Sequence, residues 1–216
     1  MRKLRLPDGA TAPAADGTMC APSATRNLAP ILQALLPRLP RSGTVLEIAS
    51  GTGQHLAAMA AHRPDLGFQP TDPDPARRAA IDARCRGLRN VAAAAELDAG
   101  RAGWSHGVAV EAVVVVNLLH LISEAEMAVL LDEAARALSP GGLLALYGPF
   151  RRGGRTVSAG DAAFDAALRG QDPEIGYKAI EIVVTVLEVL ALAPELVEMP
   201  ANNLMLFGRR GTGPGM

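Results

Sequence analysis

Aromatic residues are scarce in this chain of 216 residues, because phenylalanine, tryptophan and tyrosine together make up 3% of it. The scarcity argues weakly against a protein that stacks exposed nucleic-acid bases on aromatic side chains. An excess of charge of one sign is also lacking, since 21 basic residues oppose 22 acidic ones and the formal net charge is -1. No overall field concentrates such a protein on nucleic acid or on an anionic membrane, so a nucleic-acid partner is disfavoured.

Cysteines are few and long apolar runs are missing. Cys20 and Cys85 lie far apart without metal-ligand spacing around them, so we expect neither a disulfide framework nor a metal site. No apolar stretch reaches the ~20 residues of a membrane span, and residues 1–13 lack the apolar run of a secretory signal. We therefore expect a cytoplasmic location and no membrane partner.

What is present is the composition of a globular domain, with 49% hydrophobic residues. Residues 1–22 are rich in alanine, proline, glycine and threonine without periodicity, which predicts a flexible N-terminal arm or a lid. We expect one domain over residues 23–210, followed by a flexible tail over residues 211–216.

Strand-like and helix-like segments alternate along this domain. Strands are expected at 44–49, 66–69, 91–97, 111–117, 143–147, 195–199 and 204–209, the third being weak because alanine is a poor strand former. Helices are expected at 23–36, 54–62, 76–86, 161–168 and 177–192, and from a capping box at Ser123 and Glu126 to a stop at 140–142. The alternation predicts an α/β fold with a doubly wound, mostly parallel sheet and a ligand at the carboxyl ends of its strands.

A glycine loop follows the first expected strand. Glu47 lies at the end of that strand, and Gly51 and Gly53 allow the backbone to approach a ligand closely. A dinucleotide fingerprint needs a third glycine at the position of Leu56, so spacing favours S-adenosylmethionine over a nicotinamide cofactor. The positive charge of the sulfonium also favours an acidic neighbourhood.

Two further acids follow the next two expected strands. Asp72 is placed to accept hydrogen bonds from ribose hydroxyls, and Asp98, with Ala99 beside it, to accept from the adenine amino group. The alternatives are that Asp72 caps the next helix and that Asp98 is a turn residue. Three acids in chain order at the ends of three consecutive strands favour the ligand interpretation.

Residues 45–55, with the sequence VLEIASGTGQH, resemble the first motif of class I S-adenosylmethionine-dependent methyltransferases. Residues 25–27, 69–75, 146–154 and 198–203 are similar to a narrower, uncharacterised family, that of methyltransferase-like protein twenty-six. The resemblance implies a Rossmann-like three-layer α/β/α sandwich with a seven-stranded sheet whose last strand is antiparallel. It also implies S-adenosylmethionine as cofactor and S-adenosylhomocysteine as product. Ala49 departs from the class pattern, because many members carry glycine there.

The motif and the strand ends together define the expected cofactor contacts. These are Glu47, Ala49, Ser50, Gly51, Thr52, Gly53, Asp72, Pro73, Asp98, Ala99, Asn117 and Leu118.

His120 is the candidate general base, because it follows the central strand and its unperturbed pKa is near working pH. The alternative is a histidine hydrogen-bonded at a helix entry. Tyr147 is a second catalytic candidate that would orient the substrate, or it only packs. Residues 117–120 lack the Asn/Asp-Pro-Pro-aromatic signature, so methylation of amides or exocyclic amines is disfavoured.

Polar residues near the expected strand ends are candidate substrate contacts. They are Arg26, Asn27, Arg151, Asn202 and Asn203. For Arg151 the alternatives are that it binds an acidic substrate group or that it belongs to a solvated turn. For Asn202 and Asn203 they are that these asparagines are turn residues or that they contact the substrate.

The predicted function is methylation of an unidentified small molecule. The alternatives are a non-catalytic S-adenosylmethionine-binding protein that acts through a protein partner, and a nicotinamide-dependent oxidoreductase.

Overall fold

The computed structural model describes residues 4–6 and 9–212. Residues 1–3 and 7–8 of the predicted arm and 213–216 of the predicted tail lie outside the described residues. The chain falls into two compact parts: an N-terminal part of residues 1–98 and 110–115, and a C-terminal part of residues 99–109 and 116–216. The seven strands belong to a mixed sheet with flanking helices, which confirms the predicted α/β class.

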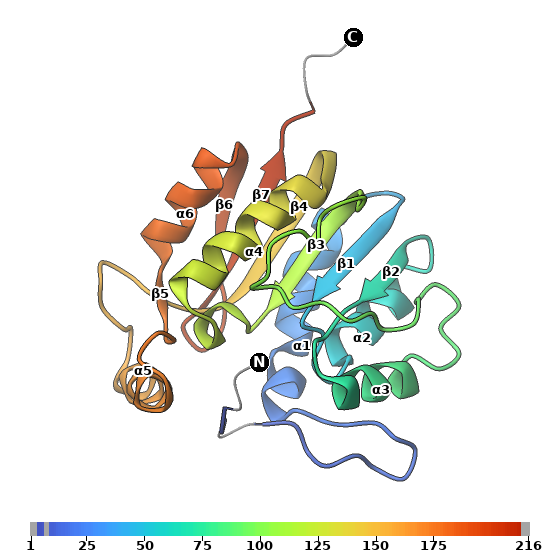
Figure 1. Cartoon of the computed structure of the whole chain (residues 1–216), viewed down its shortest axis with the longest axis horizontal. Helices are drawn as coiled ribbons and strands as arrows, with labels where there is room; N and C mark the ends of the chain where they lie inside the picture. Colours follow the sequence, from blue (N-terminus) through green and yellow to red (C-terminus); the bar gives the residue numbers. More distant parts are fainter. Residues whose placement is uncertain (1–3, 7–8, 213–216) are drawn as a thin grey trace. The chain divides into compact units, whose positions relative to one another are not determined.

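The N-terminal part contains three parallel strands in the order β2-β1-β3. Its elements are α1 (Pro22–Leu35), the short 3-10 helix η1 (Leu36–Arg38), β1 (Thr44–Ile48), α2 (Gln54–His62), β2 (Gly67–Pro70), α3 (Pro75–Arg84) and β3 (Val110–Val116). Helix α2 packs on α1, β2 and α3 (Figure 1). Residues 112–115 of β3 are buried, as expected for a valine-rich strand that is covered on both faces.

The strand predicted at 91–97 does not form. Only two isolated parallel bridges remain there, Phe68 with Val91 and Thr71 with Ala95. Four consecutive alanines occupy residues 92–95, and they offer little side-chain surface for a pleated ladder. The segment still follows β2 as an extended chain, so Asp98 comes after it as predicted.

The C-terminal part holds an antiparallel group in the order β4-β7-β6, and β5 pairs in parallel with β4. Its elements are η2 (Leu119–Leu121), α4 (Glu124–Ala137), β4 (Leu138–Arg151), α5 (Ala159–Gln171), β5 (Lys178–Ala179), α6 (Ile180–Val189), β6 (Leu192–Glu198) and β7 (Asn203–Arg210). Helix α6 runs beside β6, and α4 packs on β4 (Figure 1). Because β7 is antiparallel to both neighbours, the predicted antiparallel last strand is confirmed.

The capping box predicted at the start of α4 is present, with Ser123 Oγ accepting from Glu126 N at 3.2 Å and Glu126 Oε2 accepting from Ser123 N at 2.7 Å. The stop predicted at residues 140–142 is wrong, because α4 ends at Ala137 and β4 runs directly through these residues. Within residues 4–6 and 9–212, no helix has the length and apolar character needed to cross a bilayer.

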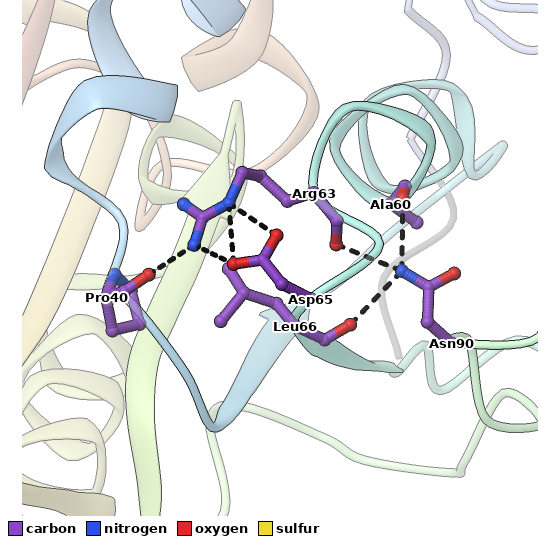
Figure 2. A network of polar contacts seen from close by, with 6 residues as sticks. All are labelled: Pro40, Ala60, Arg63, Asp65, Leu66 and Asn90. Atoms are coloured by element: carbon purple, nitrogen blue, oxygen red, sulfur yellow. Dashed lines mark hydrogen bonds and ion pairs between the residues drawn. The ribbon is translucent and has the colours of Figure 1, made fainter.

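The turn between α2 and β2 is closed by one amide, that of Asn90. Its Nδ2 lies 3.0, 3.2 and 3.1 Å from the carbonyl oxygens of Ala60, Arg63 and Leu66 (Figure 2). The Arg63 guanidinium adds three contacts to the Asp65 carboxylate, the shortest at 2.6 Å (Figure 2). Helix-end carbonyls without an intrahelical partner need such donors, so this network fixes the approach of the chain to β2.

The loop of residues 99–109 is attached to α4 through the Glu133 carboxylate. Its two oxygens accept from Gly103 N and Ser105 N, each at 2.8 Å. Between these two amides stands Trp104, the single tryptophan of the chain. Within the described part of the chain, its buried indole nitrogen has no hydrogen-bond partner.

Candidate cofactor and acceptor sites

The glycine loop is tied to β2 by hydrogen bonds on both sides of the strand end. Thr71 N donates to Glu47 O at 3.0 Å, and Ser50 N donates to Thr71 O at 2.8 Å. The Thr71 hydroxyl adds a bond to the same Glu47 carbonyl at 2.9 Å. The backbone at both ends of the turn is therefore set by the neighbouring strand.

The loop uses left-handed backbone at three positions: Ala49, Gly51 and Gly53 have φ of 55°, 60° and 72°. A β-carbon at Gly53 would lie 3.2 Å from Ile81 Cα, so this glycine allows α3 to pack closely. A β-carbon at Gly51 would contact Arg77 Nη1 at 3.4 Å, an ordinary van der Waals distance. Ala49 adopts a conformation that glycine takes without strain, which costs an L-residue about 1 kcal/mol or more.

Glu47 is the most unusual group of the loop. Its side chain is 2% exposed, and among the residues that the structure describes Oε2 has no hydrogen-bond partner. Burial and, more weakly, the charge of Asp72 raise the pKa of Glu47 to about 8, against a hydrogen bond from Ser50 that lowers it. A buried carboxylate in this state is stabilised by a cationic group that comes to face it.

Asp72 organises the loop. Its two carboxylate oxygens accept from Gly51 N and Asp74 N, each at 3.0 Å. Burial raises the pKa of Asp72, and these two bonds oppose the rise. The helix cap predicted as an alternative role belongs to Asp74, which accepts from Ala76 N at 2.8 Å. Each Asp72 oxygen keeps a lone pair for a further donor.

The other predicted cofactor residues divide between the two parts of the chain. Thr52 Oγ1 donates to Gln54 Oε1 at 2.8 Å, and the carbonyl of Pro73 accepts from Arg78 at 3.0 Å. Asp98 is the last residue of the first segment of the N-terminal part. The remaining ones, Ala99, Asn117 and Leu118, belong to the C-terminal part.

Gln54, which sequence reasoning missed, connects the glycine loop to the N-terminal segment. Its Oε1 accepts from Ala21 N at 2.7 Å, and its Nε2 donates to Thr25 Oγ1 at 2.9 Å. Arg84 makes a second connection between the glycine loop and the N-terminal segment, because it donates to Thr52 O at 2.8 Å and to Met19 O. The one local signal for Gln54 is its position directly after the second loop glycine.

Asn27, a predicted substrate residue, contacts α2. Its Oδ1 lies 2.8 Å from Nε2 of His55, a side chain that is buried. Burial lowers the pKa of His55 to about 4, so this imidazole is neutral at pH 7 and donates to Asn27. Arg26 is exposed on α1.

In the C-terminal part, His120 is buried in η2. Phe164 and Tyr177 meet its ring edge to face, with centroids at 5.8 and 6.1 Å. Burial, followed by the charge of Lys178, lowers the pKa of His120 to about 4, while Asp165 opposes the shift. The imidazole is therefore neutral at pH 7. These aromatic partners were not predicted.

Asn117 stands at the end of β3 with a left-handed φ of 56°. Its N–H donates to the carbonyl of Tyr147 at 2.8 Å, and the Tyr147 side chain is buried in β4. Leu118 is the N-cap residue of η2. Strained backbone of this kind persists where surrounding structure holds it, often at functional sites.

The hairpin asparagines differ in their roles. Asn203 Nδ2 donates to Pro200 O and Ala201 O, each at 3.1 Å, which is a turn role. Asn202 Nδ2 donates across the C-terminal part to Asp161 Oδ2 at 3.0 Å.

The arginines at and just after the end of β4 contact the protein itself. Arg151 Nε donates to Tyr177 O at 2.9 Å, and Arg152 forms an ion pair with Glu198 at 2.9 Å.

Several solved structures that resemble this chain are methyltransferases. An O-methyltransferase family protein from Burkholderia thailandensis is 22% identical, with a TM-score of 0.78 over 89% of this chain and 58% of that one. Human N-acetylserotonin methyltransferase in complex with SAM is 14% identical, with a TM-score of 0.71 over 88% and 53%. An O-methyltransferase family 2 protein from Planctomyces limnophilus in complex with apigenin is 17% identical, with a TM-score of 0.72 over 87% and 58%.

This chain therefore has the Rossmann-like class I methyltransferase fold, and it spans between half and two thirds of the length of those proteins. A family described as "Protein of unknown function (DUF938)" matches residues 18–210. The chain belongs to this family.

Proposed function

We propose that this protein is an S-adenosylmethionine-dependent methyltransferase that acts on a small molecule. The observation that carries the proposal is the buried Glu47 carboxyl group, whose Oε2 lacks a partner among the described residues. S-adenosylmethionine brings positive charge to such a carboxyl group, and Gly51 has no side chain that would hold a ligand away from the backbone.

The residues present fit this cofactor. Glu47 would face its positive charge, Asp72 would accept from the ribose hydroxyls, and Asp98 with Ala99 would hold the adenine. When bound, the cofactor supplies a methyl group activated by a sulfonium. His120, neutral at pH 7, accepts the proton that the methyl acceptor gives up. The fold shared with a methyltransferase that was solved with SAM supports this assignment.

Calorimetric titration of the full chain with S-adenosylmethionine, S-adenosylhomocysteine and NAD tests the proposal. We expect micromolar binding of both sulfur ligands, about -8 kcal/mol, and none of NAD. Asp72→Ala should weaken binding at least tenfold. Asp72→Asn keeps an acceptor for Gly51 N and separates loss of charge from loss of folding.

Asp74→Asn is the matched control, because it changes an acid in the same turn but keeps the cap on Ala76 N. It should bind the cofactor as the unchanged chain does. If neither sulfur ligand binds, the proposal is refuted. Binding without turnover against a metabolite mixture would instead favour the non-catalytic protein that acts through a partner.

The N-terminal segment is proposed to act as a lid on the cofactor site. Ala21 and Met19 are bonded to Gln54 and Arg84, and each of these two residues also bonds to Thr52 of the glycine loop. Movement of the segment and of the loop is therefore coupled by hydrogen bonds. Cofactor should protect residues 9–21 from proteolysis, and protection that does not change with cofactor would exclude a lid.

Two finer predictions remain proposals. The similarity of residues 25–27, 69–75, 146–154 and 198–203 supports kinship with methyltransferase-like protein twenty-six. A cytoplasmic location is the second of them, and cell fractionation tests it.

A further inference from the structure

A cavity of about 300 Å³ lies in the C-terminal part, where the first turn of α4, the end of α5 and the turn that leads into β5 meet. Its polar and charged lining consists of Ser123, Glu124, Arg169, Glu174 and Lys178. None of these residues is among the predicted cofactor, catalytic or substrate contacts. The volume is at the small end of the range of ligand pockets, so the cavity has the size for a small metabolite.

Lys178 is the most deeply buried charged group of this lining, with 3% of its surface exposed. Its Nζ donates to the carbonyl oxygens of Ile122 and Gly176 at 2.6 and 3.1 Å, which leaves one of its three N–H groups for a further acceptor. Burial lowers the pKa of Lys178 to about 8, the charge of Glu124 opposes this shift and that of Arg169 adds to it, so the ammonium form predominates at pH 7. A buried cation whose contacts are neutral carbonyl groups is stabilised by an anion that comes to face it.

Lysine is rare in this chain, since Lys3 and Lys178 are the 2 lysines among 21 basic residues. An ammonium group is a compact charge that three acceptors can surround, whereas the guanidinium of arginine is a wider planar fork. The protein itself supplies two of the three acceptors at Lys178. The third position is therefore suited to a ligand atom in the cavity.

Two further hydrogen-bond donors line the same cavity. Ser123 Oγ accepts from Glu126 N at 3.2 Å, which leaves its hydroxyl proton to donate. Arg169 donates through Nε to Asp165 at 3.2 Å and through Nη2 to Tyr177 O at 3.5 Å, and its side chain is 38% exposed. The other N–H groups of a guanidinium bind a carboxylate in pairs. An ammonium, a hydroxyl and a guanidinium together form a donor set for a carboxylate.

The exposed side of the lining, which we call the mouth of the cavity, carries the opposite charge. Glu124 and Glu174 line the cavity and are exposed, and Ala125 and Pro173 add apolar surface beside them. The cavity is therefore positive inside and negative at its mouth. The acids repel a polyanion such as phosphate, whereas a ligand with a carboxylate at one end and an ammonium group at the other complements both charges. An α-amino acid has this charge pattern in a small volume.

We propose that this cavity binds a small zwitterionic α-amino acid. The carboxylate of the ligand lies against Lys178, Ser123 and Arg169. Its ammonium group faces Glu124 and Glu174 at the mouth, and a short side chain packs on the apolar surface between them. The inference goes beyond the proposed methyltransferase function and does not depend on it, because the cavity needs no cofactor to be complete.

Saturation-transfer NMR of the full chain with L-alanine, acetate, methylammonium and inorganic phosphate tests the site without cofactor. L-alanine should bind about tenfold more tightly than acetate, because it adds ion pairs with two partly exposed acids, and it should also bind more tightly than phosphate. Glu174→Gln removes one of these acids, so it should weaken L-alanine binding about threefold and should not weaken acetate binding. Glu188→Gln makes the same change at an exposed acid of α6 outside the lining, and it is the matched control that should bind L-alanine as the unchanged chain does.

A second measurement follows Lys178 in the unchanged protein. Because the chain has 2 lysines, protein labelled with carbon-13 lysine gives two sets of side-chain signals, and the set that a Lys3→Arg variant retains belongs to Lys178. The ε-carbon signal of Lys178 should shift as L-alanine is added and should stay in place with methylammonium.

Three results would overturn the amino-acid site: phosphate or acetate that binds as tightly as L-alanine, a Lys178 signal that L-alanine does not move, or a Glu174→Gln variant that binds L-alanine as tightly as Glu188→Gln does. Absence of S-adenosylmethionine binding in calorimetry is a separate result, which refutes the proposed function and leaves this site untouched.

Discussion

Replacing Glu47 by glutamine should remove a pH dependence of stability that this single carboxyl group creates. The folded-state pKa is raised from 4.5 to about 8, so the folded chain holds a proton that the unfolded chain releases. The stabilisation is fully present below the unfolded pKa and is lost as pH rises through the folded pKa. At about 1.4 kcal/mol per pKa unit, the loss between pH 5 and pH 8 is about 3 kcal/mol.

Urea denaturation of the unchanged chain and of Glu47→Gln at pH 5 and pH 8 measures this term. The glutamine amide in the buried site costs about 1–3 kcal/mol at both pH values if it stays unpaired, so it cancels in the comparison. We expect the variant to gain about 3 kcal/mol relative to the unchanged chain on going from pH 5 to pH 8. Parallel pH profiles for the two proteins would refute the reasoning.

The same substitution should abolish the pH dependence of cofactor binding. A cationic ligand favours the ionised form of Glu47, so binding should release a proton near neutral pH and tighten as pH rises. Calorimetry in buffers of different ionisation enthalpy counts that proton. The Glu47→Gln variant should bind weakly and release none, whereas proton release equal to that of the unchanged chain would assign the effect to another group.

Three further outcomes are expected. Ala49→Gly should stabilise the chain by up to about 1 kcal/mol in urea denaturation, because φ is 55° at this position. Asn90→Ala should cost at least about 2 kcal/mol, since it strips a donor from three carbonyl oxygens, and an unchanged midpoint would contradict the network in Figure 2. The pKa of His120 is lowered from 6.5 to about 4, so the neutral ring contributes stability above pH 6.5 that is lost as the pH falls through 4. Between these two pH values the free energy of unfolding of His120→Gln should therefore fall by about 3 kcal/mol less than that of the unchanged chain.

The sequence predicted correctly those helices and helix starts whose sequence signals span only a few neighbouring residues. Helix α2 occupies the predicted residues 54–62, and the box at Ser123 and Glu126 starts α4 as expected. The failures come from pairing between distant segments. Residues 140–142 read locally as a turn, yet they belong to β4, whose antiparallel ladder with β7 runs from Leu143 to Pro149. The two-residue strand β5 has no periodicity to detect.

The residues of the candidate site likewise fall into those that local sequence patterns predicted and those that depend on contacts between distant segments. The acids at 47, 72 and 98 were predicted because parallel strands place their carboxyl ends at one edge of a sheet. Gln54 and Arg84 were missed because their partners Ala21 and Met19 lie 33 and 65 positions away in the chain. Phe164 and Tyr177 were missed for a similar reason, since each is an isolated aromatic residue whose meeting with His120 requires the folded C-terminal part.

The single tryptophan gives this protein a built-in optical probe of one loop. Trp104 is held between two amides that donate to Glu133, and its indole nitrogen is shielded. Emission from the folded chain should therefore be blue-shifted, and any event that frees residues 99–109 should move it to the red. The hydrogen bonds from Gly103 and Ser105 keep the pKa of Glu133 below its usual range, so the loop should stay attached in mildly acidic solution. Fluorescence can thus report the motion of this segment without a label and without interference from any second indole.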